Sequence, residues 1–229
     1  MKKEKVIVIS LGGSIIMPVK QDFKILDGFK RVLRKHYNNH RFVVVCGGGS
    51  IARKYIDALA KEGKSKYEIA MAGIRATRMN ALFMIQFFGK DANVKLPLNM
   101  EQVENDLKKN KVVFCGALRF APSSTTDGTA SKLAHFLNTE FINITNVPGL
   151  YTEDPRKNKN AKLIPKISWK DFNNMIKKIK FHAGQHFVLD QQASNIIRKN
   201  RIRTYIIGSN FALDNLLKGK KFIGTIISG

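Results

Sequence analysis

Short apolar runs alternate with longer stretches of helical periodicity along the first part of the chain. Residues 6–11 and 41–46 are almost continuously apolar, which is typical of strands buried on both faces of a parallel sheet. A helical pattern covers residues 22–37 between them, and another begins near Ser50. The order of strand, helix and strand predicts βαβ units.

The same alternation continues to the end of the chain. It predicts further strands at residues 111–115, 140–145, 203–207 and 222–227. Residues 64–89 form one long helical pattern, and we expect its face of small and apolar residues to lie in the core or in a subunit contact. That face comprises Ile69, Gly73, Ala76, Asn80, Phe83 and Met84. The predicted fold class is therefore α/β, with helices on both faces of the sheet.

Residues 151–167 interrupt the pattern with a polar, proline-containing stretch that cannot form a central strand. We predict a loop or small hairpin over the sheet there. No internal repeat and no low-complexity linker divides the sequence. A single domain spanning residues 1–229 is the expected organisation.

Composition adds a strong positive charge to this picture. The chain has 40 Lys and Arg against 17 Asp and Glu, a formal net charge of +23. The lysines are scattered among many Ile and Asn residues, as a biased genome composition would leave them, and no RNP, zinc-finger or arginine-rich motif accompanies them. Nucleic acid is thus a possible partner but not the favoured one.

Other compositional signals exclude several protein classes. No apolar run approaches the roughly 18 residues that span a bilayer, and the run after Lys5 stops at Gly12, so we expect a cytoplasmic protein without a membrane partner. The two cysteines, Cys46 and Cys115, are too few for a disulfide framework and are expected to be buried thiols. The histidines lack metal-ligand spacing with a third partner, so we assign no transition-metal site.

Glycine clusters mark the ends of the first two predicted strands. Residues 12–14 read Gly-Gly-Ser, and residues 47–50 read Gly-Gly-Gly-Ser directly before a helix. Such turns bring backbone N–H groups close to an anion, and a helix N-terminus adds partial positive charge. Tight turns use glycine for structural reasons too, and neither cluster has Rossmann or Walker spacing. Two clusters at adjacent strands nevertheless favour phosphate binding.

Two later segments extend the candidate site. Residues 122–128 carry hydroxyl groups and one carboxylate before a helical pattern, with Thr126 or Asp127 as the predicted N-cap. Hydroxyls at a helix start can also hold a phosphate or a sugar. Residues 144–155 follow a buried strand, and open α/β sheets bind ligands at the carboxyl ends of their strands. All four segments can therefore line one edge of the sheet.

Six segments in this order resemble the amino-acid kinase superfamily, and within it the archaeal type of UMP kinase. The segments are residues 10–14, 47–55, 73–81, 125–127, 145–155 and 161–164. The resemblance spans nearly the whole chain. It implies a three-layer αβα sandwich around a mainly parallel open sheet, and transfer of the γ-phosphoryl group of Mg-ATP to UMP, giving UDP and ADP. It also implies ATP and Mg²⁺ as cofactors, with no assigned magnesium ligands, and a hexamer built from dimers.

The resemblance also implies a role for individual residues. Those facing the ATP phosphates or the transferred group are Gly13, Ser14, Gly49 and Arg53, and those on the adenine and ribose side are Thr145, Asn146, Tyr151 and Asp154. Those on the UMP side are Gly48, Leu118, Arg119, Ser124, Thr125 and Thr126. Asp127, Lys162 and Arg53 form the implied catalytic set, and Asp190 is expected as an N-cap of a late helix.

The sequence departs from the superfamily pattern at several positions. Ser10 replaces a lysine, as is common in archaeal UMP kinases. Ala70 and Pro148 each stand where an aspartate is expected, and residues 116–122 lack the expected glycine-rich run. Glu68, two residues earlier, is a neighbouring carboxylate, but on a helix it lies out of phase with the one missing at Ala70.

These departures leave alternatives open. They include a kinase of the same fold for another small anionic acceptor, and a non-catalytic nucleotide-binding or nucleic-acid-binding relative. Arg75, Arg78 and Asn80 on the long helix are expected to serve a surface or interface role.

Overall fold

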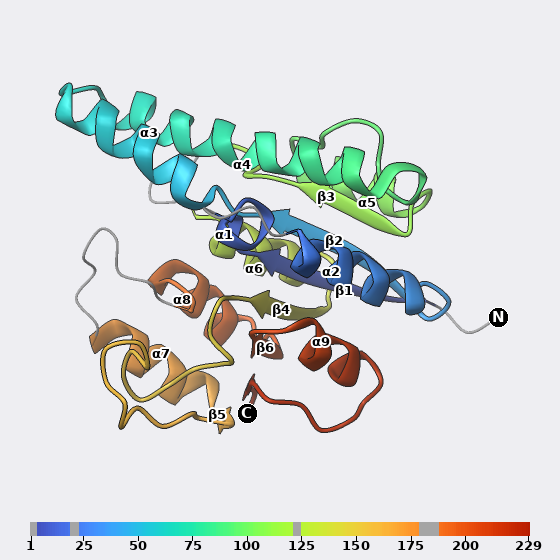
Figure 1. Cartoon of the computed structure of the whole chain (residues 1–229), viewed down its shortest axis with the longest axis vertical. Helices are drawn as coiled ribbons and strands as arrows, with labels where there is room; N and C mark the ends of the chain where they lie inside the picture. Colours follow the sequence, from blue (N-terminus) through green and yellow to red (C-terminus); the bar gives the residue numbers. More distant parts are fainter. Residues whose placement is uncertain (1–3, 19–22, 121–124, 179–187) are drawn as a thin grey trace.

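A seven-stranded sheet runs through the middle of the molecule in the order β3-β2-β1-β4-β6-β7-β5 (Figure 1). The computed structural model describes the chain apart from residues 1–3, 19–22, 121–124 and 179–187. The strands are β1 (Lys5–Leu11), β2 (His40–Cys46), β3 (Val112–Cys115), β4 (Glu140–Ile144), β5 (Lys166–Ile167), β6 (Thr204–Ile207) and β7 (Thr225–Ile227). Strands β3, β2, β1, β4 and β6 are parallel, whereas β7 is antiparallel to β6.

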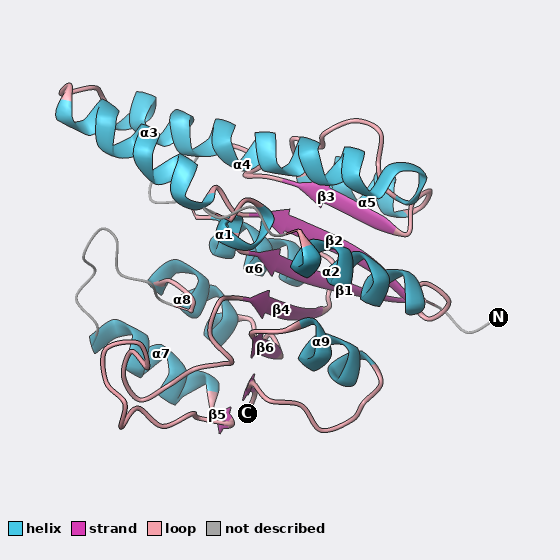
Figure 2. Cartoon of the chain, in the orientation of Figure 1, coloured by secondary structure: helices cyan, strands magenta, loops and turns pink. Residues whose placement is uncertain are grey.

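Helices cover both faces of this sheet, which confirms the three-layer αβα architecture (Figure 2). They are α1 (Gly13–Ile16), α2 (Lys24–Lys35), α3 (Gly49–Lys61), α4 (Lys66–Phe88), α5 (Met100–Leu107), α6 (Thr126–Phe136), α7 (Trp169–Lys178), α8 (Gln191–Lys199) and α9 (Asn210–Leu217), with a 3₁₀ turn at Gly89–Asp91. Helices α2, α4 and α9 pack on one face, and α5 to α8 pack on the other.

Strand β1 shows why the apolar runs are continuous. Successive side chains of a strand point to opposite faces of its sheet. Ile7 and Ile9 therefore join the core with α2, α4 and α9, while Val8 joins the core on the opposite face, and none of the three is more than 3% exposed. A strand covered on both faces needs apolar residues at every position.

The carboxyl ends of the central strands lie level with one another. Leu11 at the end of β1 is in register with Cys46 of β2 on one side and with Ile144 of β4 on the other. The Gly12 N–H donates to the Ile144 carbonyl oxygen at 3.3 Å. Because the chain crosses from β3 to β4 over β1, the gap between β1 and β4 is the topological switch point, where open α/β sheets bind ligands.

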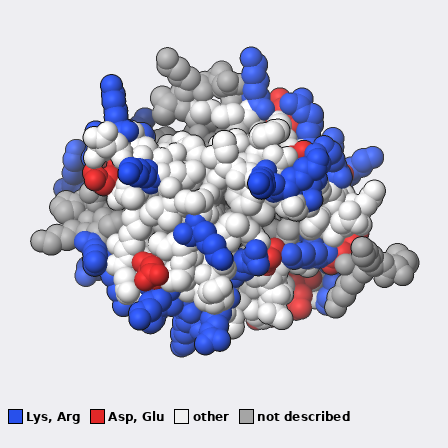
Figure 3. All heavy atoms as spheres, turned by 90° about the horizontal axis from the view of Figure 1, so that it is seen from below, with Lys and Arg blue, Asp and Glu red and all other residues white. Residues whose placement is uncertain are grey.

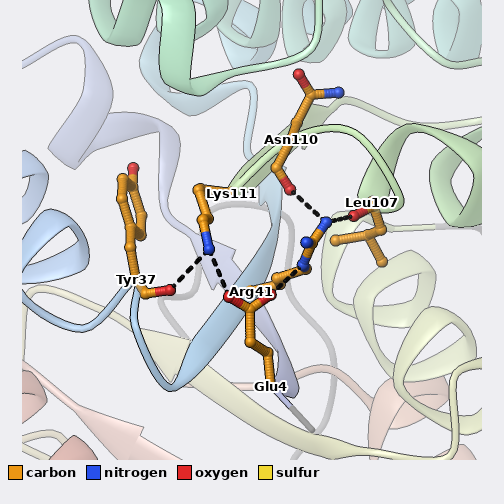
Figure 4. Close-up of polar contacts among 6 residues, drawn as sticks. All are labelled: Glu4, Tyr37, Arg41, Leu107, Asn110 and Lys111. Atoms are coloured by element: carbon orange, nitrogen blue, oxygen red, sulfur yellow. Dashed lines mark hydrogen bonds and ion pairs between the residues drawn. The ribbon is translucent and has the colours of Figure 1, made fainter. Parts of the chain in front are cut away.

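Charged residues form hydrogen bonds at the amino ends of β1, β2 and β3, opposite the carboxyl ends described above (Figure 4). The Glu4 carboxylate accepts hydrogen bonds from Arg41 and Lys111, and Arg41 also donates to the Leu107 carbonyl oxygen. Lys111 donates to the Tyr37 carbonyl oxygen at 3.1 Å. The Lys111 and Arg41 contacts lower the pKa of Glu4. This cluster fixes the amino ends of β1, β2 and β3 and lies at the end of the strands remote from the glycine loops.

Most elements agree with the sequence predictions, and the differences lie at the sheet edge. The last strand is limited to β7, three residues long, and the two-residue β5 was not predicted. The predicted hairpin is present, since Tyr151 and Leu163 form an antiparallel bridge. Both cysteines are buried free thiols, as expected. Within the described part of the chain, no helix is long and apolar enough to cross a membrane.

Candidate active site

The loops after β1 and β2 pack with backbone against backbone. A Cβ atom on Gly13 would lie 2.1 Å from the Gly49 nitrogen and 2.6 Å from the Gly47 carbonyl oxygen. Gly49 has a positive φ of 65°, which favours glycine. The two predicted phosphate cradles therefore form one continuous surface at the level ends of β1 and β2.

Asn80 of α4 holds this surface in place. Its amide nitrogen donates to the Gly47 carbonyl oxygen at 2.6 Å, and its side chain is buried. The expected surface or interface role of Asn80 is therefore wrong, because the helix carries it under the glycine loop. The Arg78 side chain also makes a contact within the chain, because it donates to the Leu118 carbonyl oxygen at 2.7 Å. Arg75, in contrast, is exposed.

The start of α3 presents a free cation beside the glycine loop. Gly48 and Gly49 begin this helix, and Arg53 lies one turn further on. The Arg53 side chain is exposed and has no hydrogen bond or ion pair with any residue that the structure describes. Ser14 is likewise exposed, at the start of α1. Backbone N–H groups, the partial positive charge of the helix end and a guanidinium together suit a phosphate.

Asp127 lies between the end of β1 and the start of α6. The Ser10 hydroxyl donates to its carboxylate at 2.7 Å. Thr125 caps the helix by accepting from the Gly128 N–H at 2.9 Å, so the predicted cap at Thr126 or Asp127 is wrong by one or two residues. Since Thr125 performs the capping, the carboxylate of Asp127 is available to face Ser10.

Asp190 joins α8 to the same site. One carboxylate oxygen accepts from the Ala193 N–H at 2.9 Å, which confirms the expected N-cap. The other oxygen accepts a hydrogen bond from the Thr125 hydroxyl. Asp190 therefore connects the start of α8 to the start of α6. Asp127 lies in the first turn of that same helix α6.

Burial and a neighbouring carboxyl group change the ionisation of Asp127. Burial raises the pKa of Asp127 to about 7, and the negative charge of Asp190 adds to this effect. The hydrogen bond from Ser10 acts in the opposite direction but is the smaller influence. Asp127 therefore changes protonation near neutral pH.

A cavity of about 350 Å³ adjoins the end of β4. Its lining includes all four residues predicted for the adenine and ribose side, Thr145, Asn146, Tyr151 and Asp154. The apolar part of the lining comes from Val147, Leu150, Met175, Ile176 and Val188. The volume and this mixture of polar and apolar groups are typical of small-ligand pockets.

Asp154 at the cavity wall is held by its neighbour Arg156. The guanidinium donates to both carboxylate oxygens, each at 3.0 Å, and this pair lowers the pKa of Asp154 to about 2. The carboxylate is therefore ionised and fixed in orientation at neutral pH.

Lys162 lies on the second arm of the hairpin. Its backbone exchanges hydrogen bonds with Thr152, while its side chain is exposed and unpaired within the described residues. On the predicted acceptor side, Leu118 is buried and Arg119 is exposed. Ser124 lies outside the described residues.

Sequence reasoning missed the contacts made by Ser10 and Asn80. A polar residue in an otherwise apolar buried strand, next to a glycine cluster, was the available signal for Ser10. For Asn80 the signal was a polar side chain on the small, apolar face of a long helix.

Comparisons with known proteins find relatives over nearly the whole chain. Residues 5–208 match the amino acid kinase family. The chain belongs to the amino acid kinase family. It is 35% identical to the uridylate kinase of Pyrococcus abyssi over 93% of this chain and 96% of that one, and 35% identical to that of Methanocaldococcus jannaschii over 97% and 99%. The crystal structure of uridylate kinase from Archaeoglobus fulgidus has a TM-score of 0.84 and 32% identity over the whole of both chains.

Replacing Gly13 tests the contact between the two glycine loops of this amino acid kinase. In Gly13→Ala the new methyl group meets the Gly49 backbone, so we expect a loss of about 2–3 kcal/mol of unfolding free energy, measured by denaturant titration. Gly12→Ala is the matched control, because its Cβ has 3.6 Å to the nearest atom. Equal stability of the two variants would contradict the packing described here.

The pKa of Asp127 predicts a pH-dependent stability. Because folding raises this pKa above the unfolded value, the carboxyl group favours the folded state below about pH 4, and this contribution is lost as the pH rises through 7. We expect Asp127→Asn to match the wild type near pH 4 and to exceed it by on the order of 4 kcal/mol at pH 8. Urea unfolding at several pH values measures this difference, with the exposed Asp57→Asn as the control. A less stable Asp127→Asn protein at pH 8 would contradict the assignment.

Proposed function

We propose that this protein transfers the γ-phosphoryl group of Mg-ATP to UMP, giving UDP and ADP. The observation that carries the proposal is the position of the 350 Å³ cavity, which begins at Thr145 directly beside the glycine loops. A nucleoside in the cavity would extend its phosphates over those loops. The naming of the archaeal relatives as uridylate kinases supports UMP as the acceptor.

The donor nucleotide would span the switch point of the sheet. Its base and ribose occupy the cavity lined by Asn146 and Tyr151, and its phosphates lie over Gly13 and Gly49. Mg²⁺ bound to those phosphates supplies charge neutralisation. Phosphate oxygens and water are its expected ligands, because Mg²⁺ usually keeps several waters and binds through substrate phosphates.

Phosphoryl transfer makes few covalent demands on the protein. An oxygen of the UMP phosphate forms a bond to the γ-phosphorus while the bond to the bridging β,γ-oxygen breaks, roughly in line. Negative charge spreads over the transferred group, and Arg53 and Lys162, exposed cations without a partner among the described residues, would stabilise it. Asp127, held by Ser10, would order the groups between the two nucleotides.

The same resemblance underlies the proposals on organisation and location. We propose a single domain over residues 1–229, a hexamer built from dimers, and a cytoplasmic location. Exposed apolar side chains on α3 and α4, such as Tyr55 at 56% and Met79 at 67% exposure, support a subunit contact along this helical pair.

The charge on the face drawn in Figure 3 gives no support to a separate nucleic-acid role. On the face drawn in Figure 3, Lys and Arg side chains are distributed around the surface without forming one continuous stripe. Scattered positive charge attracts anionic ligands in general, including nucleotides, and carries no sequence-reading geometry.

The decisive experiment is an ATP-dependent phosphorylation assay with purified protein and UMP, CMP, dUMP or no acceptor. We expect UDP formation with UMP as the preferred acceptor, and a loss of activity in Asp127→Asn. Turnover of none of these nucleotides would overturn the proposal and favour another small anionic acceptor or a binding role.

Lys162 tests the electrostatic part of the mechanism. Lys162→Gln removes one full charge from the transferred group, so we expect kcat to fall about 100-fold. The melting temperature should stay unchanged because the side chain is exposed and unpaired in the described structure. Lys159→Gln, an exposed lysine of the same hairpin, is the matched control. Equal kcat values for the two variants would remove Lys162 from the mechanism.

A further inference from the structure

The order of the strands determines where the acceptor must bind, if the proposed phosphoryl transfer is correct. The cavity for the donor lies beyond β4, and the glycine loops lie over β1 and β2. An in-line transfer requires the acceptor on the far side of the transferred group. That side is formed by the start of α3, the chain after β3 and the neighbouring face of α4.

The chain after β3 is tied firmly to α4. The Ala117 N–H donates to the Thr77 hydroxyl at 2.9 Å, and Arg78 donates to the carbonyl oxygens of Ala117 and Leu118 at 3.1 and 2.7 Å. A Cβ atom on Gly116 would lie 2.7 Å from the Thr77 hydroxyl oxygen. Residues 116–118 therefore have a fixed position against the middle of this helix.

Beyond this anchor the chain reaches the first turn of α4, where two aromatic rings meet. The rings of Phe120 and Tyr67 have centroids 5.0 Å apart and an interplanar angle of 75°. Both side chains remain exposed, Phe120 at 38% and Tyr67 at 57%. An edge-to-face pair that still offers ring surface to solvent is suited to bind a third flat ring.

The α4 face between the aromatic pair and the anchor is small and apolar. Ala70, Ile74 and Thr77 follow Tyr67 at spacings of three, seven and ten residues, so they share this face. Glu68 does not supply a carboxylate here, because it accepts from the Ser65 N–H and hydroxyl at 2.9 and 2.7 Å in a capping box. This contact agrees with the position of Glu68 out of phase with Ala70 on the helix.

We propose that Tyr67 and Phe120 bind the base of the acceptor nucleotide by aromatic contact. The acceptor phosphate lies at the other end of the same face, where Gly48 packs against Ala76 and Thr77. Ten residues of helix separate Thr77 from Tyr67, about 15 Å along the axis, which accommodates a whole extended nucleoside monophosphate with a contact at each end. Contact with the two rings favours acceptors that carry a flat base over phosphates that have none. It requires no hydrogen bond from position 70, where Ala70 has no polar side chain.

The test compares acceptors with and without a base. In Tyr67→Leu and Phe120→Leu we expect the KM for UMP to rise about tenfold, as for the loss of a base–aromatic contact, with the KM for ATP unchanged. Inhibition by ribose 5-phosphate, which has no base, should not change. Phe211→Leu is the control, since this exposed aromatic residue of α9 lies outside both the proposed site and the proposed subunit contact.

Each other outcome overturns the inference. An unchanged KM for UMP in both variants, or an equal loss of ribose 5-phosphate binding, shows that the pair does not contact the base. A changed oligomer size in light scattering, with UMP affinity unchanged, assigns the pair to a subunit contact. Melting temperatures identify a variant that fails through misfolding, and the second variant then carries the test. Failure of wild-type protein to phosphorylate any nucleotide is a different result, which overturns the proposed function itself.

Discussion

The site depends on one steric constraint, the direct contact between the backbones of two glycine loops. This contact is possible because β1 and β2 end in register, so the loops leave the sheet side by side. Neither Gly13 nor Gly49 has space for a Cβ atom. The absence of side chains leaves backbone N–H groups and a helix start as the surface that a ligand meets, and these groups bind anions without a charged residue.

Two carboxyl groups beside this surface, those of Asp127 and Asp190, lower the stability of the folded state when Asp127 is ionised. Asp127 and Asp190 lie at the starts of α6 and α8, and within the described part of the chain their side-chain partners are two hydroxyl groups, those of Ser10 and Thr125. A cation in place of Ser10 would stabilise an ionised Asp127, whereas a hydroxyl leaves its pKa near 7. Destabilising groups that persist in a fold are typical of functional sites. The cost is consistent with a carboxylate kept for its chemistry rather than for stability.

The sequence was sufficient for the architecture but not for the contacts within the site. Continuous apolar runs predicted the central strands, because short runs of this kind are typical of strands that helices cover on both faces. The two-residue β5 has no periodicity to detect, and it forms because β7 offers an open edge. Resemblance identified Asn146 and Tyr151, which the structure brings to one cavity. The contacts of Ser10 and Asn80 join residues far apart in sequence, so only tertiary packing reveals them.

Helix α4 contacts both the glycine loop, where the donor phosphates are proposed to bind, and the proposed acceptor site. Asn80 fixes the glycine loop, and Thr77 and Arg78, within one turn, fix the chain after β3. Tyr67 extends the same helix to the edge of the acceptor face. Because a helix has a rigid rise per residue, these attachments set the distance between the phosphate surface and the aromatic pair. Phosphoryl transfer depends on that kind of fixed separation, since positioning and electrostatics, not covalent chemistry, provide most of its acceleration.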